Sequence, residues 1–329
     1  MVSQSQHSEF GLIARYFTPS PPSRDAGVAL GVGDDCTLLL PAAGQQLAVS
    51  VDTSVAGVHY PADAPADAVG HRALAVSLSD LAAMGARARW CLMALTLEEA
   101  DEAWLAGFSR GFRDLAEASG TALVGGDVTR GATAIGVTVM GEVAPEAALT
   151  RHGGRPGDLV AVTGALGGGA GGLALWQRGE RDPSHPLLIR YLRPQPRLAA
   201  GEALAGLATA AIDISDGLLA DLGHVLAASG VGAELWVDRL PRSDAFHAVR
   251  HAGHIDEADW YGLVLAGGDD YELCFTAPPA REETIRAALA ASGVAVTAVG
   301  GIEVEHGLRC RHDDGTEYRP PREGYQHFS

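Results

Sequence analysis

Short aspartate clusters recur along almost the whole of this 329-residue chain, and each follows an apolar run and adjoins glycine or another small residue. A carboxylate at the end of a buried strand is costly unless a positive group meets it. The chain has no lysine, and its 24 arginines face 41 acidic residues. Divalent cations are the natural remaining partner, because Mg²⁺ prefers hard oxygen ligands on loops and often shares them with phosphate. The clusters are GVGDDC at 31–36, LAVSVDTSV around Asp52, ALAVSLSDLAAMG around Asp80, GGDVTRG at 125–131, DISDG at 213–217 and GGDDYEL at 267–273.

Composition indicates a compact folded protein, with 47% hydrophobic and 20% charged residues. The net charge of -17 argues against binding to nucleic acid or to an anionic membrane surface. No apolar stretch reaches the roughly 20 residues needed to span a bilayer, and the amino terminus lacks the pattern of a signal peptide. We therefore expect a cytoplasmic protein with reduced cysteines at Cys36, Cys91, Cys274 and Cys310.

Alternating strand-like and helix-like segments predict an α/β or α+β fold. The length suffices for two domains, and we place their boundary near 147–155, giving domains 1–150 and 151–329. A Pro/Ser loop is expected at 18–27. The first half predicts strands at 46–52, 89–97, 121–124 and 133–143 and helices at 66–86 and 99–119; the second predicts helices at 170–178, 197–208, 217–229 and 280–292 and strands near 232–237, 271–276, 294–300 and 308–312.

Asp80 is the strongest single candidate for a ligand. It is the only charge between Ala73 and Ala86, and it continues a helical stripe through Val69 and Val76 that should be packed. A metal ion, or a phosphate bridged by a metal, is the favoured partner. The alternatives are exposure to solvent or an ion pair with Arg72, Arg87 or Arg89.

The other clusters each allow two interpretations. Asp34 and Asp35 either share a cation or belong to an ordinary turn. The glycines before Asp127 would let a ligand approach the main chain, and Arg130 could then meet a phosphate or pair with Asp127. In DISDG, the serine and the second aspartate suit helix N-caps, but a helix N-terminus also attracts phosphate.

The glycine run GALGGGAGG at 164–172 predicts either a phosphate cradle or a hinge. It is not a P-loop, because that motif requires a lysine, and the missing lysine also excludes a protein kinase. Any phosphate must therefore be met by Mg²⁺, arginine and backbone N–H groups. The histidines form no HExxH pattern, and only His59, after Asp52, is kept as a candidate.

Taken in order, these segments resemble the thiamine-monophosphate kinase family, which is related to aminoimidazole ribonucleotide synthetase, selenophosphate synthetase and HypE. The resemblance extends from 9–17 to 324–328 and also includes LTRHGGRPGD at 149–158 and LRPQPRL at 192–198. It implies a two-domain PurM-like fold whose amino-terminal mixed sheets, in the Mg²⁺- and ATP-binding domain, pair across a homodimer. It also implies ATP-dependent phosphorylation of thiamine monophosphate to thiamine diphosphate, by direct in-line transfer of the γ-phosphoryl group with several Mg²⁺ ions.

Matching positions carry the family's site onto this chain, with no protein residue in a catalytic acid or base role. Val51 has no hydroxyl and would bind metal through its carbonyl, and Asp269 replaces a longer glutamate. Gly168 and Gly169 stand where the family has Asp or Ser. The resemblance implies metal ligands at Asp35, Ser50, Val51, Asp52, Asp80, Asp127, Asp213 and Asp216, ATP contacts at Gly126, Asp127, Arg151 and Ser215, and substrate contacts at His59, Asp269 and Tyr325.

Two alternative functions stay open. One is another ATP-using enzyme of the same superfamily, which would activate a carbonyl or a selenide. Its selenide-type and HypE-type members resemble each other in relying on a reactive cysteine near one end of the chain, a feature that this sequence does not show. The other is a non-catalytic regulator that binds Mg²⁺ and nucleotide. The presence of every aspartate cluster favours the enzyme.

Overall fold

The computed structural model describes residues 9–18, 27–253, 257–322 and 324–325. The chain forms two compact units, one of residues 1–81 and 86–146 and the other of residues 82–85 and 147–329. Most of the Pro/Ser loop expected at 18–27 lies outside the described residues, as do positions 326–328 of the carboxyl-terminal segment.

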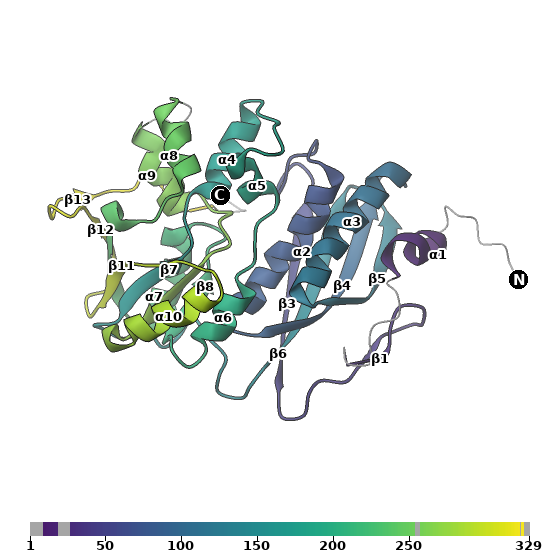
Figure 1. The fold of residues 1–329 in the computed structure, drawn as a ribbon, viewed down its shortest axis with the longest axis horizontal. Helices are drawn as coiled ribbons and strands as arrows, with labels where there is room; N and C mark the ends of the chain where they lie inside the picture. The colour runs from purple at the N-terminus through teal and green to yellow at the C-terminus, as the bar shows by residue number, and fades with distance from the viewer. Residues whose placement is uncertain (1–8, 19–26, 254–256, 323, 326–329) are drawn as a thin grey trace, which may run out of the picture. The chain divides into compact units, whose positions relative to one another are not determined.

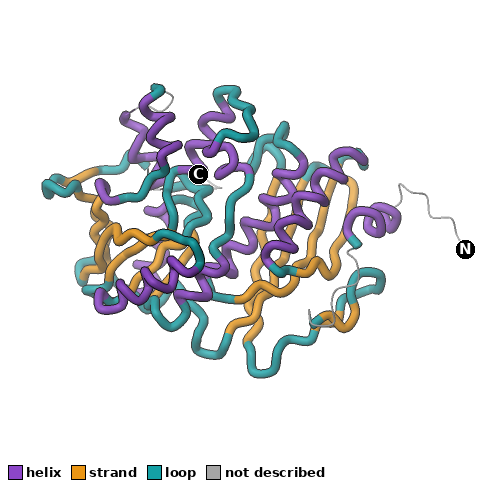
Figure 2. The backbone as a smooth tube through the Cα atoms, in the orientation of Figure 1, coloured by secondary structure: helices purple, strands orange, loops and turns teal. Residues whose placement is uncertain are grey.

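The first unit contains a four-stranded sheet with two helices on one face (Figures 1 and 2), and β1 (Val28–Leu30) and β2 (Leu38–Leu39) form a separate antiparallel pair. Its strand order is β3-β6-β4-β5, in which β4 and β5 are parallel and the other neighbours antiparallel. The elements are α1 (Glu9–Leu12), a π-helix (Ile13–Phe17), β1 (Val28–Leu30), β2 (Leu38–Leu39), β3 (Gln46–Val55), α2 (Ala66–Ala83), β4 (Arg87–Leu97), α3 (Glu102–Ser119), β5 (Ala122–Arg130) and β6 (Ala134–Val143).

Strand β3 lies at an edge of this sheet and has two different faces. Successive side chains of a strand alternate between faces, and here Ser50 and Asp52 are half-buried while their odd-numbered neighbours are exposed. The exposed fractions are 46% for Leu47, 57% for Val49 and 64% for Val51. One face of β3 is therefore polar and turned inward, and the other is apolar and open.

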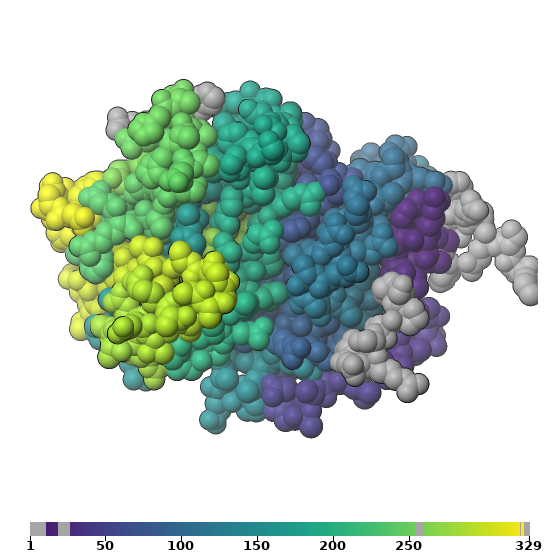
Figure 3. Space-filling model, in the orientation of Figure 1, coloured from purple at the N-terminus to yellow at the C-terminus, as the bar shows by residue number. Residues whose placement is uncertain are grey.

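The second unit is a seven-stranded sheet, ordered β13-β12-β9-β11-β7-β10-β8. Strand β10 is buried along its length, and the outer side of α10 is exposed in the space-filling view (Figure 3). The strands are β7 (Leu159–Thr163), β8 (Ala210–Asp213), β9 (Gly232–Trp236), β10 (Leu273–Ala277), β11 (Val296–Glu303), β12 (Gly307–Arg311) and β13 (Glu317–Tyr318). The helices are α4 (Gly168–Gln177), α5 (Pro186–Leu192), α6 (Leu198–Leu204), α7 (Leu218–Ser229), α8 (Asp244–His251), α9 (Glu257–Ala266) and α10 (Glu282–Ala291). Short 3-10 turns lie at Val237–Arg239 and Pro279–Arg281.

The mixed α/β prediction is confirmed, and two details of it are wrong. The strand expected at 121–124 continues to Arg130, because the backbone of β5 pairs with β4 through the glycines. Helices α5, α8 and α9 were not anticipated. The four cysteines are free, as expected. No helix in the described ranges has the length and apolar character needed to cross a membrane.

Candidate active site

Two carboxylates meet between β3 and α2 in the first unit. Asp52 is on the inward face of β3, and Asp80 is in the last turns of α2. The Ser50 hydroxyl donates a hydrogen bond to Asp80. Burial, and then the charge of Asp80, raise the pKa of Asp52 to about 6. Over the described part of the chain Asp80 forms no ion pair with an arginine, so the ion-pair alternatives are wrong.

This pair fits a divalent cation. Two half-buried carboxylates and a hydroxyl are hard oxygen donors, and a cation between them would remove the repulsion that raises the pKa of Asp52. Among the described residues, however, no three Asp, Glu, His or Cys side chains form a complete metal cluster. Such a partial set suits Mg²⁺, which commonly takes only one or two protein carboxylates and completes its shell with water and phosphate oxygens.

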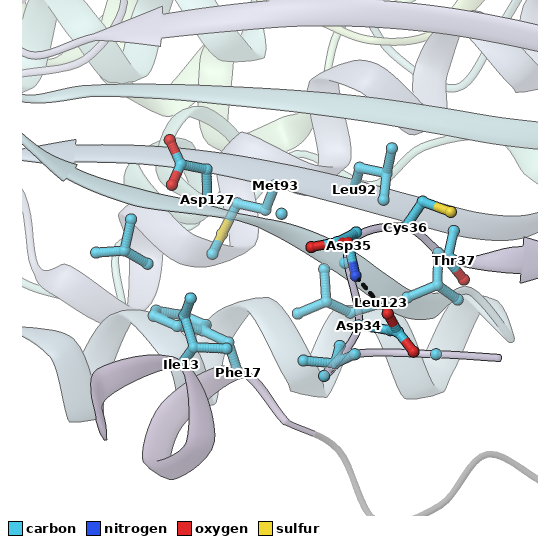
Figure 4. A pocket seen from close by; sticks show the side chains of 17 residues that line it. Ile13, Phe17, Asp34, Asp35, Cys36, Thr37, Leu92, Met93, Leu123 and Asp127 are labelled. Atoms are coloured by element: carbon cyan, nitrogen blue, oxygen red, sulfur yellow. Dashed lines mark hydrogen bonds between the residues drawn. The ribbon is translucent and has the colours of Figure 1, made fainter. Parts of the chain in front are cut away.

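A cavity of about 590 Å³ lies in the first unit, where the loop before β2 faces strand β5 (Figure 4). Asp34 and Asp35 turn their carboxylates to opposite sides of it, and an Asp34 oxygen accepts the N–H of Asp35 at 2.9 Å. The cavity thus combines acidic groups with an apolar wall. Its apolar lining includes Ile13, Phe17, Met93, Leu123 and Val124, and its polar rim includes Asp127.

Gly126 is required by strand packing. Its φ is +154°, and a Cβ there would lie 1.9 Å from the carbonyl oxygen of Met93. That side of the glycine faces strand β4, while Gly126 also lines the cavity, and the approach of a ligand to its main chain stays a prediction. Asp127 is exposed beside the cavity and forms no ion pair with Arg130 within the described ranges.

In the second unit, residues 214–217 connect several candidate positions through the main chain. Asp213 ends strand β8 and is buried. The carbonyl of Ser215 accepts the N–H of Asp269 at 2.8 Å, and the carbonyl of Asp216 accepts the N–H of Tyr325 at 3.1 Å. The predicted metal and nucleotide residues of this loop therefore adjoin the predicted substrate residues Asp269 and Tyr325.

Asp221 fixes the same loop from its other side. Its carboxylate accepts the N–H groups of Ser215, Asp216 and Gly217 at 3.0, 3.1 and 3.1 Å. Helix α7 has no side-chain cap at Gly217, so Ser215 and Asp216 do not serve as its N-caps. Burial, followed by the charge of Asp216, raises the pKa of Asp221 to about 7. Sequence reasoning missed Asp221; the only signal was an acid in the first turn of an otherwise apolar helix.

The glycine run at 164–172 serves close packing. Asp270 accepts the N–H groups of Gly167, the N-cap, and of Gly169 in the first turn of α4, at 2.8 and 3.1 Å. A Cβ at Gly169 would lie 2.1 Å from the carbonyl oxygen of Asp269. Close packing thus explains the glycine at 169, and the choice between a phosphate cradle and a hinge stays open. Burial raises the pKa of Asp270 to about 7.

The segment before β10 holds an unusual backbone. Asp269 and Tyr271 have φ values of 60° and 50°, which residues other than glycine rarely adopt. The Tyr271 hydroxyl donates to the Asp269 carboxylate at 3.1 Å and so orients it. Such strain persists only when surrounding contacts fix it, and it concentrates at functional sites.

The remaining candidates are placed as follows. The Nδ1 atom of His59 accepts the N–H of Val55 at 3.0 Å and closes the loop after β3. Arg151 is exposed, and its carbonyl accepts the Ser229 hydroxyl at 3.2 Å. The Val51 side chain is on the face of β3 opposite to Asp52.

In the first unit the candidates lie in separate places, with Asp52 and Asp80 between β3 and α2 and Asp35, Gly126 and Asp127 at the cavity. In the second unit the main chain joins Ser215 and Asp216 to Asp269 and Tyr325. The convergence of these places on one site stays a prediction.

Comparison with known proteins identifies the class. The AIR synthase related protein N-terminal domain matches residues 33–143, and the AIR synthase related protein C-terminal domain matches residues 155–313. The fold is also that of the hydrogenase maturation protein HypE of Escherichia coli, with a TM-score of 0.74 at 20% identity. The chain is therefore a two-domain protein of the PurM-like, AIR-synthase-related class, as the sequence predicted.

Closer relatives identify the family within that class. The thiamine-monophosphate kinase of Salmonella typhimurium is 44% identical over 98% of both chains. The crystal structure of thiamine-monophosphate kinase from Stenotrophomonas maltophilia K279a has a TM-score of 0.83 and 43% identity, covering 90% of this chain and 93% of that one. A structure described as AaThiL complexed with AMPPCP and TMP has a TM-score of 0.77 and 30% identity, covering 88% and 89%. The chain belongs to the thiamine-monophosphate kinase family.

Proposed function

We propose that this chain uses ATP to phosphorylate thiamine monophosphate, giving thiamine diphosphate and ADP. The observation that carries the proposal is similarity along the full length, 44% over 98% of the chain, to a thiamine-monophosphate kinase. The structure of one relative holds AMPPCP, an ATP analogue, together with TMP. This pair of ligands is consistent with ATP and thiamine monophosphate as the two substrates. The acidic groups described above supply the kind of ligands that such a reaction needs.

In this proposal Mg²⁺ is the cofactor, and carboxylates of both units bind it. When bound, it would neutralise phosphate oxygens and hold the two substrates in line. Asp52 and Asp80 carry the strongest case, because they repel each other and lack an arginine partner in the described part of the chain. In this proposal the other metal ligands are Asp35, Ser50, the Val51 carbonyl, Asp127, Asp213 and Asp216, with Gly126, Asp127, Arg151 and Ser215 at ATP and His59, Asp269 and Tyr325 at the substrate.

Transfer is direct in this proposal. An oxygen of the substrate's phosphate forms a bond to the γ-phosphorus of ATP, and the bond from that phosphorus to the departing ADP oxygen breaks. The attacking oxygen is already anionic, so no side chain has to remove a proton. The protein contributes positioning and charge, which phosphoryl transfer chiefly requires. Radiolabel from γ-labelled ATP that stays covalently on the protein would contradict direct transfer.

The decisive experiment is incubation with ATP, Mg²⁺ and thiamine monophosphate, followed by chromatography. We expect thiamine diphosphate and ADP in equal amounts, and no product when EDTA removes the metal. Unphosphorylated thiamine serves as the control acceptor and should give no product. ATP turnover without thiamine diphosphate would point to another enzyme of the superfamily, and binding of nucleotide without turnover would point to a regulator.

A homodimer is also part of the proposal, and the open face of β3 supports it. Leu47, Val49 and Val51 form an apolar row on an edge strand, a pattern typical of a surface covered by a second copy. We expect Val49→Asp to convert a dimer into a monomer in sedimentation experiments. Val304→Asp is the matched control, because Val304 is 78% exposed in the other unit. A monomeric unmodified protein would exclude the dimer.

A further inference from the structure

Residues 214–217 are held by hydrogen bonds on both sides of the main chain, and Asp221 is the acceptor for the N–H groups of residues 215–217. We propose that Asp221 is a positioning residue, which holds this loop in the conformation that presents Asp213 and Asp216 to Mg²⁺. The inference rests on the proposed function, because it assigns a role within that site. Asp221 lies inside helix α7 and is not itself among the candidate ligands.

The geometry leaves the loop little freedom. The single Asp221 carboxylate accepts three consecutive N–H groups, at 3.0 to 3.1 Å, and is only 3% exposed. On the carbonyl side, Ser215 accepts from Asp269 and Asp216 accepts from Tyr325. The peptides that carry Ser215 and Asp216 are therefore fixed at both their donor and acceptor ends.

The neighbouring residue strengthens this arrangement. Ile214 donates its N–H to the Glu272 carbonyl and accepts the N–H of Tyr271, each at 2.8 Å. Tyr271 and Asp269 occupy the strained segment described above, so the loop anchors that segment as well. A shift of residues 215–217 would move the metal side and the substrate side of this unit together.

Asparagine weakens this arrangement. All three N–H groups donate to one oxygen of the Asp221 carboxylate, Oδ2, so an amide oxygen in its place could still accept them. A neutral oxygen accepts more weakly than an ionised one, so the three bonds would loosen together and the loop would be held less firmly. If Asp221 only stabilises the start of α7, Asp221→Asn should lower the melting temperature and change nothing else. If Asp221 positions the metal ligands, the variant should also need more Mg²⁺ for activity.

Asp158 supplies a matched control. It is 5% exposed in the same unit, and its carboxylate accepts the Arg155 N–H at 3.0 Å and the Thr209 hydroxyl at 2.7 Å. It therefore fixes a turn, as Asp221 does, but contacts none of the candidate ligands. Asp158→Asn should lower the melting temperature about as much as Asp221→Asn does.

The experiment compares Asp221→Asn with Asp158→Asn in the full-length protein. We expect Asp221→Asn to lower kcat and to raise the Mg²⁺ concentration for half-maximal rate, each by about 10- to 100-fold, as loss of a supporting contact behind metal ligands does. Asp158→Asn should leave both within about threefold of the unmodified protein. Equal changes in the two variants, or no change in Asp221→Asn, would overturn the inference.

Two readouts do not depend on turnover. Mg²⁺ with AMPPCP should raise the melting temperature of the unmodified protein and of Asp158→Asn more than that of Asp221→Asn; equal shifts would contradict the inference. If the unmodified protein makes no thiamine diphosphate, the proposed function fails, and this thermal shift alone decides the role of Asp221. If Asp221→Asn does not fold, amide exchange in the unmodified protein decides: slow exchange at 215–217 supports positioning, and exchange as fast as in an exposed turn overturns it.

Discussion

The acids of the two units differ in the hydrogen-bond donors and counter-charges that surround them. In the first unit Asp52 and Asp80 face each other with a serine hydroxyl, and no arginine pairs with them in the described ranges. In the second unit Asp221 accepts three backbone N–H groups, and Asp270 accepts two. Acids that accept several backbone N–H groups act as scaffold, whereas Asp52 and Asp80, which accept from serine hydroxyls, are available to a cation.

Glu272 is the clearest scaffold acid. It is fully buried and accepts hydrogen bonds from the Arg190 guanidinium at 2.7 Å, from Arg197 at 2.5 and 2.6 Å, and from the Thr163 hydroxyl at 2.7 Å. It directly precedes β10, and its bonds to Arg190 and Arg197 tie the start of that strand to α5 and to the start of α6. Two arginine side chains face its single negative charge, so no metal cation is needed there.

Asp80→Asn should have the largest effect of these variants on activity. Unchanged activity would contradict the contrast between the acids of the two units. We expect activity to fall by about 100-fold or more, because the amide is a poor Mg²⁺ ligand and the metal stabilises charge in the transition state. The melting temperature without metal should stay the same or rise, since the repulsion with Asp52 disappears. Initial rates and thermal melts test this, and an unchanged rate would remove Asp80 from the metal set.

Glu272→Gln should act on stability first. Removing one partner of a fully buried ion pair typically costs about 3–5 kcal/mol, and we expect about 2–3 kcal/mol here because both arginines keep partial exposure. Urea denaturation measures the loss. Glu282→Gln is the control, since the exposed Glu282–Arg286 pair should contribute about 0.5 kcal/mol or less. Equal losses in the two variants would mean that the buried network is no stronger than a surface pair.

The pH dependence of stability should sharpen the contrast further. Burial raises the pKa of Asp270 from 3.8 to about 7, so the folded state keeps a proton on this carboxyl at pH values where the unfolded state has already lost it. The stabilisation of the folded state by this proton is complete below about pH 4 and is lost as the pH rises to about 7. Asp270→Asn cannot titrate, so its melting temperature should improve relative to the unmodified protein between pH 5 and pH 7. A constant difference across that range would contradict the shift.

Val51→Thr should have the smallest effect. The side chain is 64% exposed on the face of β3 opposite to Asp52, so a hydroxyl placed there would not reach the acidic pair. We expect kcat to change by less than about twofold, in contrast to the large losses that follow removal of a supporting metal contact. A large gain in activity would show that the hydroxyl side chain contributes to the metal site from a partner or through a rearranged strand.

Strong periodicity made much of the fold predictable. Helices α2 and α3 and strands β3, β4 and β6 begin and end within a few residues of the expected positions. Helix α8 was missed because it has only eight residues, and its N-cap at Ser243 follows a proline-containing turn. Helix α9 was missed because its apolar residues surround it on all sides, so no amphipathic pattern marks it.

The site was predictable where chemistry depends on residue type and was missed where it depends on backbone direction. Asp52 and Asp80 stand out in sequence because each is an isolated charge in an apolar element, and the structure places them together. Asp221 does not stand out, because an acid near the start of a helix usually faces water, and Asp270 is marked only as one member of the GGDDYEL cluster. Only the folded backbone reveals that their oxygens meet converging N–H groups.

By itself, the sequence determined that this protein has many acids, no lysine and alternating faces on β3, because these properties follow from residue identity and local periodicity. The tertiary structure decided which acids are satisfied internally and which are left to a ligand. Hydrogen bonding depends on where distant N–H groups point, and that direction is fixed only when the sheets and helices pack.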